Sequence, residues 1–170
     1  MPSALRQRSG RSKVPRTCIG QWLRAALLCQ QELAGKLSLK INGGTKAGWN
    51  NDDEPAVIEA AAELLFPRYF GASYDVRAVT AFAAEIRDGT AGSSRPLPQL
   101  EVEAVIRSAL GESDVITNDI TLNEKVRIYL IALVGTTTRL GIDTAAVARV
   151  IVEAEQMAFE RGWNPPLADG

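Results

Sequence analysis

Apolar residues recur every three to four positions along most of the chain, which is the spacing of one face of an α-helix. Between residues 53 and 163 this pattern divides into five segments, each bounded by glycine, proline or short polar residues. The sequence therefore predicts an all-α fold, a compact multi-helix bundle of about five body helices with a preceding amphipathic helix. The inward positions of the five stripes are Val57, Ile58, Ala61, Leu64 and Leu65, then Val76, Val79, Phe82, Ala83 and Ile86, then Val102, Val105, Ile106, Ala109 and Leu110, then residues 126–134, and finally Val147, Val150, Ile151, Ala154 and Ala158.

Short polar residues, prolines and glycines mark where these helices should begin and end. Asp53 shortly before Pro55 suits a helix start, and Pro67 should end or kink that first helix. Thr121 and Glu124 form a capping-box pattern ahead of the fourth segment. The other expected caps and stops are Asp75, Gly89, Gly111, Gly141, Asp143 and Gly162.

The run 126–134 is apolar nearly all round, unlike the other stripes. A helix of that kind is usually the central, buried one. Its β-branched residues leave a buried strand open as the alternative.

The first 48 residues form a basic leader that differs in composition from the rest. Residues 1–16 carry five cationic side chains and little to bury, so we expect them to be disordered. Residues 19–37 carry the apolar stripe that predicts the preceding amphipathic helix. A Gly- and Asn-rich stretch, 42–53, is the expected linker to an acidic helical domain at 49–170, which ends in a short extended tail.

The net charge of −1 conceals a strong asymmetry along the chain. Residues 1–48 hold nine Lys or Arg and one acid, a balance of +8, whereas residues 49–170 hold ten basic and nineteen acidic side chains, a balance of −9. The two parts could attract each other, or the leader could bind nucleic acid, an anionic membrane or an acidic protein.

The chain contains no histidine, which removes the commonest general base and the commonest metal ligand. Ser-His-Asp and Cys-His catalysis, HExxH zinc sites and Glu-x-x-His di-iron sites are therefore excluded within one chain. Cys18 and Cys29 match no redox or metal spacing, and we interpret them as buried thiols. No phosphate- or dinucleotide-binding glycine motif is present, so we expect no cofactor and no metal.

No apolar run is long enough to predict a transmembrane helix. Residues 19–28 follow a basic flank, but Arg24 interrupts them, which makes a poor signal-peptide core. We therefore expect a cytoplasmic protein, with export and organelle import as alternatives.

Residues 136–151 resemble the turn and recognition helix of bacterial helix-turn-helix regulators. In that motif a glycine occupies the turn, an apolar residue follows it and a valine packs the second helix, as Gly141, Ile142 and Val147 do in this chain. The resemblance implies a DNA-binding regulator. The residues that it would place in a major groove are Thr144, Ala145, Ala148 and Arg149.

This match departs from the motif in three ways. Thr137 stands where the motif usually has alanine, and Thr136 stands where it usually has an apolar residue. Glu153 and Glu155 closely follow the reading face, where acids would repel phosphate. Two core helices joined by a glycine turn would explain the same pattern.

Acidic side chains are the remaining candidates for chemistry. Asp52, Asp53 and Glu54 cluster before the first body helix, and Glu59 and Glu63 lie four residues apart on it. Paired carboxylates can divide acid and base roles, and their oxygens can bind Ca²⁺ or Mg²⁺. A histidine-free enzyme or metal-binding protein is thus a further alternative, although acids at a helix start also simply complement the helix dipole.

These observations together predict a non-enzymatic helical interaction or regulatory protein of bacterial type, which binds a protein partner or forms a homo-oligomer. The expected anchors are Trp22, Leu23 and Leu27 on the leader helix, with Trp163 and its proline-rich tail as a second candidate. A lipid surface could also receive Trp22, but packing of the leader helix on the body or in a partner's groove is simpler.

Overall fold

The computed structural model describes residues 55–163 and four positions before them, Gly20, Leu23, Arg24 and Leu27. Within these residues the chain forms helices and no strand, so the all-α prediction is confirmed. The run 126–134 lies inside a helix, and the strand alternative for it is wrong. The helices are α3 (Ala56–Phe70), α4 (Val76–Thr90), α5 (Gln99–Ala109), α6 (Leu122–Leu140) and α7 (Thr144–Glu160).

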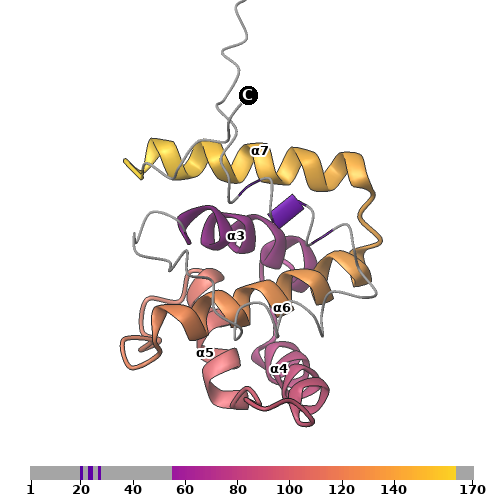
Figure 1. The fold of residues 1–170 in the computed structure, drawn as a ribbon, viewed down its shortest axis with the longest axis vertical. Helices are drawn as coiled ribbons and strands as arrows, with labels where there is room; N and C mark the ends of the chain where they lie inside the picture. The colour runs from indigo at the N-terminus through magenta and orange to yellow at the C-terminus, as the bar shows by residue number, and fades with distance from the viewer. Residues whose placement is uncertain (1–19, 21–22, 25–26, 28–54, 164–170) are drawn as a thin grey trace, which may run out of the picture.

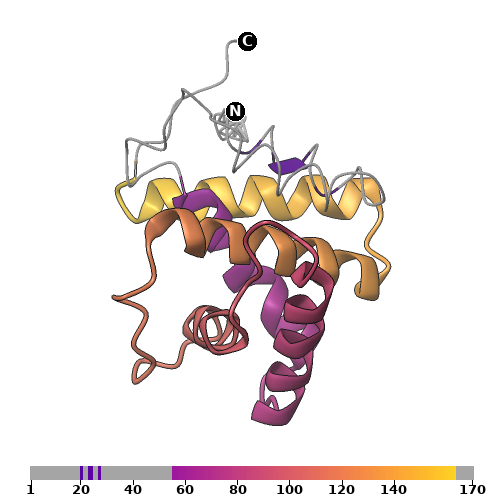
Figure 2. The same ribbon diagram turned by 60° about the horizontal axis from the view of Figure 1, so that its bottom comes forward.

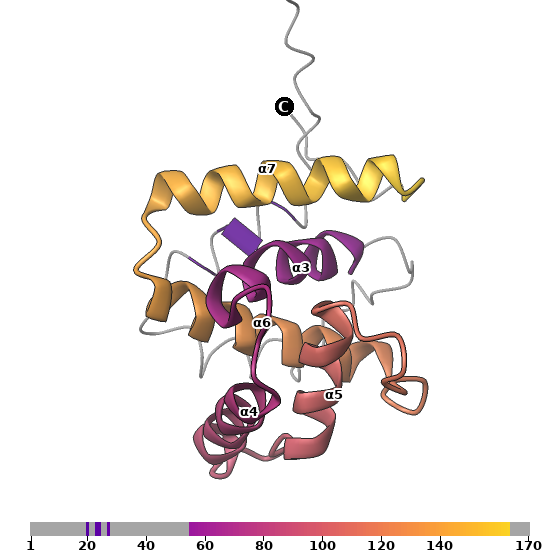
Figure 3. The same cartoon turned by 180° about the vertical axis from the view of Figure 1, so that it is seen from behind.

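Helix α3 lies at the centre of the arrangement. It packs against α6 and α7 and also touches α5, while α4 packs mainly on α5. Figures 1 and 3, which view the molecule from opposite sides, show α7 along one edge and α4 and α5 at the other. Although α6 and α7 are consecutive in the chain, α3 separates them, and they are not among the closely packed pairs.

The central position of α3 follows from its alanine content. Residues around most of its circumference are buried, whereas the sequence favoured the run 126–134 as the central helix. Alanine is small, so neighbouring helices approach the α3 backbone closely, and an alanine-rich helix can be enclosed without long apolar side chains. The buried residues of α3 are Ala56, Val57, Ile58, Ala60, Ala61, Ala62, Leu65 and Phe66.

Three of the predicted helix starts, at Asp75, Thr121 and Asp143, are confirmed by hydrogen bonds, while the one at Asp53 lies outside the described residues. Three capping side chains each accept a backbone N–H from the first turn, which supplies partners that the helix itself cannot provide. These bonds join Asp75 Oδ1 to Arg77 N (2.9 Å), Thr121 Oγ1 to Glu124 N (3.3 Å) and Asp143 Oδ1 to Ala146 N (2.7 Å). Gly141 ends α6 in the left-handed conformation (φ 60°), as its place in the sequence suggested.

Neither Pro67 nor Gly89 ends its helix. Helix α3 continues past Pro67 to Phe70, so of the two expectations for Pro67 only a kink remains, because a proline in the last turn removes a single hydrogen bond. The Pro67 carbonyl still accepts the Gly71 N–H at 2.9 Å. Helix α4 likewise passes through Gly89 and ends at Thr90.

The described positions of the leader contribute to the same core as the body helices. Leu23 and Leu27 are helical and completely buried, and both belong to the main apolar cluster. In Figures 1 and 2 the described leader positions, drawn in indigo, lie beside α7. The apolar stripe of the leader is thus used, at these two positions, by the chain itself.

Candidate functional site

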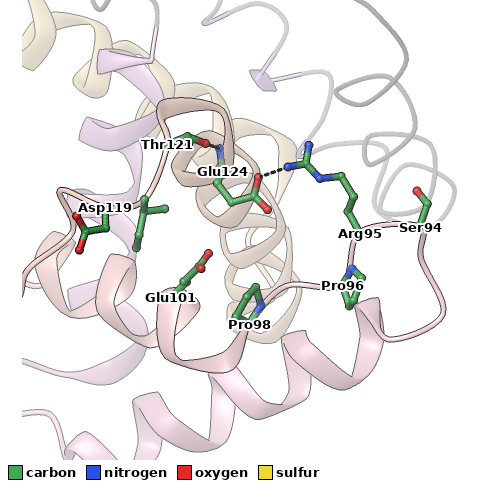
Figure 4. A pocket seen from close by; sticks show the side chains of 9 residues that line it. Ser94, Arg95, Pro96, Pro98, Glu101, Asp119, Thr121 and Glu124 are labelled. Atoms are coloured by element: carbon green, nitrogen blue, oxygen red, sulfur yellow. Dashed lines mark hydrogen bonds and ion pairs between the residues drawn. The ribbon is translucent and has the colours of Figure 1, made fainter.

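A hollow of about 460 Å³ opens where the loop before α5, the start of α5 and the start of α6 meet (Figure 4). We call it the acidic hollow, because three of its lining residues are carboxylates. Its volume falls in the range of small-molecule and side-chain binding sites. The lining residues are Ser94, Arg95, Pro96, Pro98, Glu101, Asp119, Ile120, Thr121 and Glu124.

One wall of the acidic hollow is a loop that the core holds in place. Leu97 is completely buried, and its N–H donates to the hydroxyl of Thr90 at the end of α4 (3.1 Å). Pro98 then adopts an extended conformation directly before α5. The buried leucine and its hydrogen bond tie this segment to the bundle.

Glu124 stands between two guanidinium groups at the edge of the acidic hollow. Its carboxylate lies 3.4 Å from Arg95 (Figure 4) and 3.5 Å from Arg127. Only half of the predicted capping box therefore forms. The hydroxyl of Thr121 accepts the Glu124 N–H, but the Glu124 carboxylate turns to the arginines instead of returning to the Thr121 backbone.

Arg127 lies directly behind this wall. Its side chain is only 2% exposed, and its Nη2 donates to the backbone carbonyl of Arg95. Within the described residues, its Nε and Nη1 have no hydrogen-bond acceptor. Burial lowers the pKa of Arg127, and the neighbouring charge of Arg95 lowers it further, while Glu124 acts against both. The single carboxylate of Glu124 is thus shared between two cations.

The other two carboxylates of the acidic hollow lack such partners. Among the described residues, neither Glu101 nor Asp119 forms an ion pair. Figure 4 shows Glu101 extending into the space below Glu124, with Asp119 at the opposite edge. The hollow therefore combines one neutralised carboxylate with two that remain free to attract a cation.

Two large apolar side chains lie close in the sequence to the residues of the acidic hollow, although neither lines it. Leu100, between Pro98 and Glu101, is 79% exposed, and Ile116, in the loop that leads to Asp119, is 76% exposed. These are the most exposed large apolar residues of the described chain. Exposed apolar residues beside free charges are typical of surfaces that bind other proteins.

The predicted leader anchors occupy different environments. Leu23 and Leu27 are buried in the chain's own core, so an outside partner cannot reach them while they are packed there. Trp22 lies outside the described residues. Trp163 is half-buried against the core, its N–H donates to the Ala158 carbonyl (3.0 Å), and its ring lies 5.6 Å from the guanidinium carbon of Arg161. The following Pro165 and Pro166 lie outside the described residues.

The segment 136–151 contains the predicted turn but not a packed helix pair. In helix-turn-helix proteins the recognition helix packs closely on the helix before it, whereas here α3 lies between α6 and α7. The four predicted reading residues do lie on the outer side of α7. Thr144, Ala145 and Arg149 are exposed and Ala148 is half-buried. DNA binding through them stays a prediction that this arrangement does not favour.

The two predicted carboxylates on α3 have different environments. Arg161 donates two hydrogen bonds to Glu63, at 2.9 and 2.5 Å. Burial raises the pKa of Glu59, and the charge of Glu63 raises it further, while Lys125 and Arg161 oppose the shift. Burial and the same two carboxylates also raise the pKa of Tyr129. The residues lining the acidic hollow include neither glutamate, and Asp52, Asp53 and Glu54 lie outside the described residues.

The described residues bring together no group of three or more acidic or cysteine side chains placed to hold a metal ion. None of their helices is long and apolar enough to cross a bilayer. The chain matches no protein-family model, no curated protein and no solved structure. The function can therefore be inferred only from the positions of the chain's own side chains.

The sequence did not predict the acidic hollow. Its walls come from two short segments, 94–101 and 119–124, that meet only because α5 and α6 pack together. Two signals were nevertheless present in the sequence. Leu100 lies outside the inward stripe of its helix, and Ile116 lies in an otherwise polar loop.

Proposed function

We propose that this chain is a non-enzymatic interaction protein whose acidic hollow receives a basic side chain from a segment of another protein. The observation that carries the proposal is Glu101, a carboxylate that extends into the hollow without an ion-pair partner among the described residues. A cationic side chain of a partner would supply the missing charge.

The chemistry of the hollow favours binding over catalysis. Glu124 is already engaged by two cations, Arg95 and Arg127, so its carboxylate is not free to act on a substrate. The Ser94 hydroxyl makes no hydrogen bond within the described residues, so no described base activates it as a nucleophile. Binding of a cationic side chain requires only negative charge and a space of suitable size, and the hollow provides both.

Neighbouring groups define the kind of segment that fits. Leu100 and Ile116, exposed near the hollow in the sequence, would offer contacts to apolar side chains of the same segment. A peptide segment with both lysine or arginine and apolar residues meets these requirements.

Calorimetric titration of the full chain with a synthetic peptide of alternating lysine and leucine tests the proposal. We expect binding that weakens as salt is added, because the attraction is electrostatic. The double variant Glu101→Gln with Asp119→Asn should weaken it about tenfold, a loss of about 1.4 kcal/mol. The peptide with glutamate in place of lysine should not bind.

A matched control removes the same formal charge elsewhere. Asp88 and Glu160 are exposed acids on α4 and α7, so Asp88→Asn with Glu160→Gln changes the net charge equally without touching the hollow. If both double variants weaken binding alike, the attraction is a general property of an acidic body, and the acidic hollow is not the site.

A further inference from the structure

The outer side of α7 carries an apolar stripe that is open to solvent along its first half and middle. Val152 is 45% exposed at the middle of the helix, Ala145 is exposed near its start, and Phe159 near its end is partly buried. The side chains that α7 contributes to the core lie on the opposite side. A shallow hollow of about 340 Å³ runs along this outer side and is lined by Ala148, Arg149, Val152, Glu153 and Gln156.

The spacing of the stripe is that of a helix-pairing surface. Ala145, Val152 and Phe159 are each seven residues apart, so they form a straight line along a helix that pairs with another. Ala148 adds a small residue beside this line. Small residues allow two helix backbones to approach closely.

We infer that this surface pairs with α7 of a second copy of the chain, in antiparallel orientation about a two-fold axis near Val152. In that arrangement Val152 faces its own counterpart. Ala145 faces Phe159 of the other copy, so a small residue meets a large one at both ends of the contact. One surface thus complements itself, as a two-fold dimer requires.

Charge complementarity supports the antiparallel choice. Arg149 and Glu153 are both exposed, and they lie on either side of the proposed axis. Antiparallel pairing brings each Arg149 close to Glu153 of the other copy, whereas parallel pairing would put each residue level with its own equivalent and create no such contact. Among the described residues, Glu153 has a single ion pair, with Arg68, at 3.4 Å between two half-exposed side chains. Such a pair contributes little and leaves Glu153 available.

The size of the surface sets the expected strength. A helix of 17 residues is about 25 Å long at 1.5 Å per residue. A single pair of such helices buries less than the roughly 1,000 Å² typical of a stable interface. The dimer should therefore be weak and dependent on concentration. It does not rest on the proposed binding of a basic segment, since the acidic hollow involves no α7 residue.

Sedimentation equilibrium of the full chain, from about 1 µM to about 1 mM, tests this inference. We expect a reversible monomer–dimer equilibrium that Val152→Asp weakens at least about tenfold. The matched control is Val76→Asp, because Val76 is a similarly exposed valine (42%) on α4. Equal effects of the two substitutions, or a monomer at every concentration, would overturn the inference.

A charge exchange then tests the orientation. Arg149→Glu and Glu153→Arg should each weaken the dimer, because each places like charges opposite one another. The double variant carries both exchanged charges and should restore the dimer to within about threefold of the original. Failure of the double variant to recover, with thermal unfolding showing that it is folded, would rule out the antiparallel register.

Discussion

Both terminal nitrogens of Arg161 donate hydrogen bonds to the carboxylate of Glu63, and this contact joins the end of α7 to the middle of α3. A second pair, Arg68 with Glu153, joins the same two helices further along. The later residue of α3 pairs with the earlier residue on the α7 side, so the two helices run antiparallel. The Arg161 guanidinium also lies over the Trp163 ring, which holds the turn after α7 against this contact.

The two ion pairs should differ in strength. Glu63→Gln and Arg161→Gln, measured with the double variant by urea denaturation, should give a coupling of about 0.5–1 kcal/mol, because the bidentate pair is partly shielded from water. Salt should reduce this coupling. The same cycle on Arg68 and Glu153 serves as the control and should give a coupling near zero. A larger value for the control would mean that geometry does not decide the strength of these pairs.

Glu59 should make the free energy of unfolding depend on pH. Because its folded pKa is raised, the native state keeps its proton when the unfolded chain has already lost it. Stability should therefore fall as the pH rises from about 4.5 through the raised pKa. Glu59→Gln removes this cost, so the variant should gain stability relative to the original chain as the pH rises across that window. A difference that stays constant from about pH 4 to about pH 8 would contradict this.

Two glycines within helices should respond to alanine in opposite ways. A Cβ on Gly135 would lie 3.2 Å from the Phe82 ring and 3.1 Å from Arg139. Phe82 is buried between Tyr69 and Phe70, so its ring has little room to move. Gly135→Ala should destabilise the fold by about 1 kcal/mol, because the steric cost exceeds the gain in helix propensity.

Gly89 in α4 is the matched control for that substitution. A Cβ at Gly89 would meet no atom within 4 Å. Gly89→Ala should therefore stabilise the fold by about 0.5–1 kcal/mol, through helix propensity alone. Thermal unfolding of both variants would distinguish the steric effect at Gly135 from the effect of helix propensity. If alanine stabilised the fold at both positions, the contact with Phe82 would not restrict a side chain at position 135.

Removal of the buried guanidinium of Arg127 should reduce the free energy of unfolding less than removal of the negative charge of its partner, Glu124. Arg127→Met deletes a guanidinium with two unsatisfied nitrogens and should change the free energy of unfolding by less than about 1 kcal/mol. Glu124→Gln leaves the buried cation without a counter-charge and should cost about 3 kcal/mol. Urea denaturation of both variants checks this order, and the reverse order would mean that the ion pair itself stabilises the fold.

Local signals in the sequence predicted the helices well. Asp75, Thr121 and Asp143 each begin a helix through a short-range hydrogen bond, so the information lies within three residues of the cap. The sequence did not reveal that α3 is the central helix. Alanine gives a weak apolar signal, and which helices surround it depends on contacts between distant parts of the chain.

The candidate sites were harder to predict for the same reason. The stripe on the leader predicted packing either on the body or in a partner's groove, and the structure buries Leu23 and Leu27 within the chain. The residues of the acidic hollow have no shared spacing, because two separate segments build it. Glu124 was expected to complete a cap, but Arg127 lies one turn further along and competes for its carboxylate.

The placement of α3 between α6 and α7 also constrains the order of folding. Helices α4 and α5 are neighbours in the chain and in space, so they can form a hairpin early with little loss of chain entropy. The pairing of α3 with α7 instead closes a loop that contains α4, α5 and α6. We therefore expect this pairing to form more slowly than the α4–α5 hairpin. Helix α7 is consequently the element whose detachment should open the structure first, and hydrogen exchange should report its amides as less protected than those of α6.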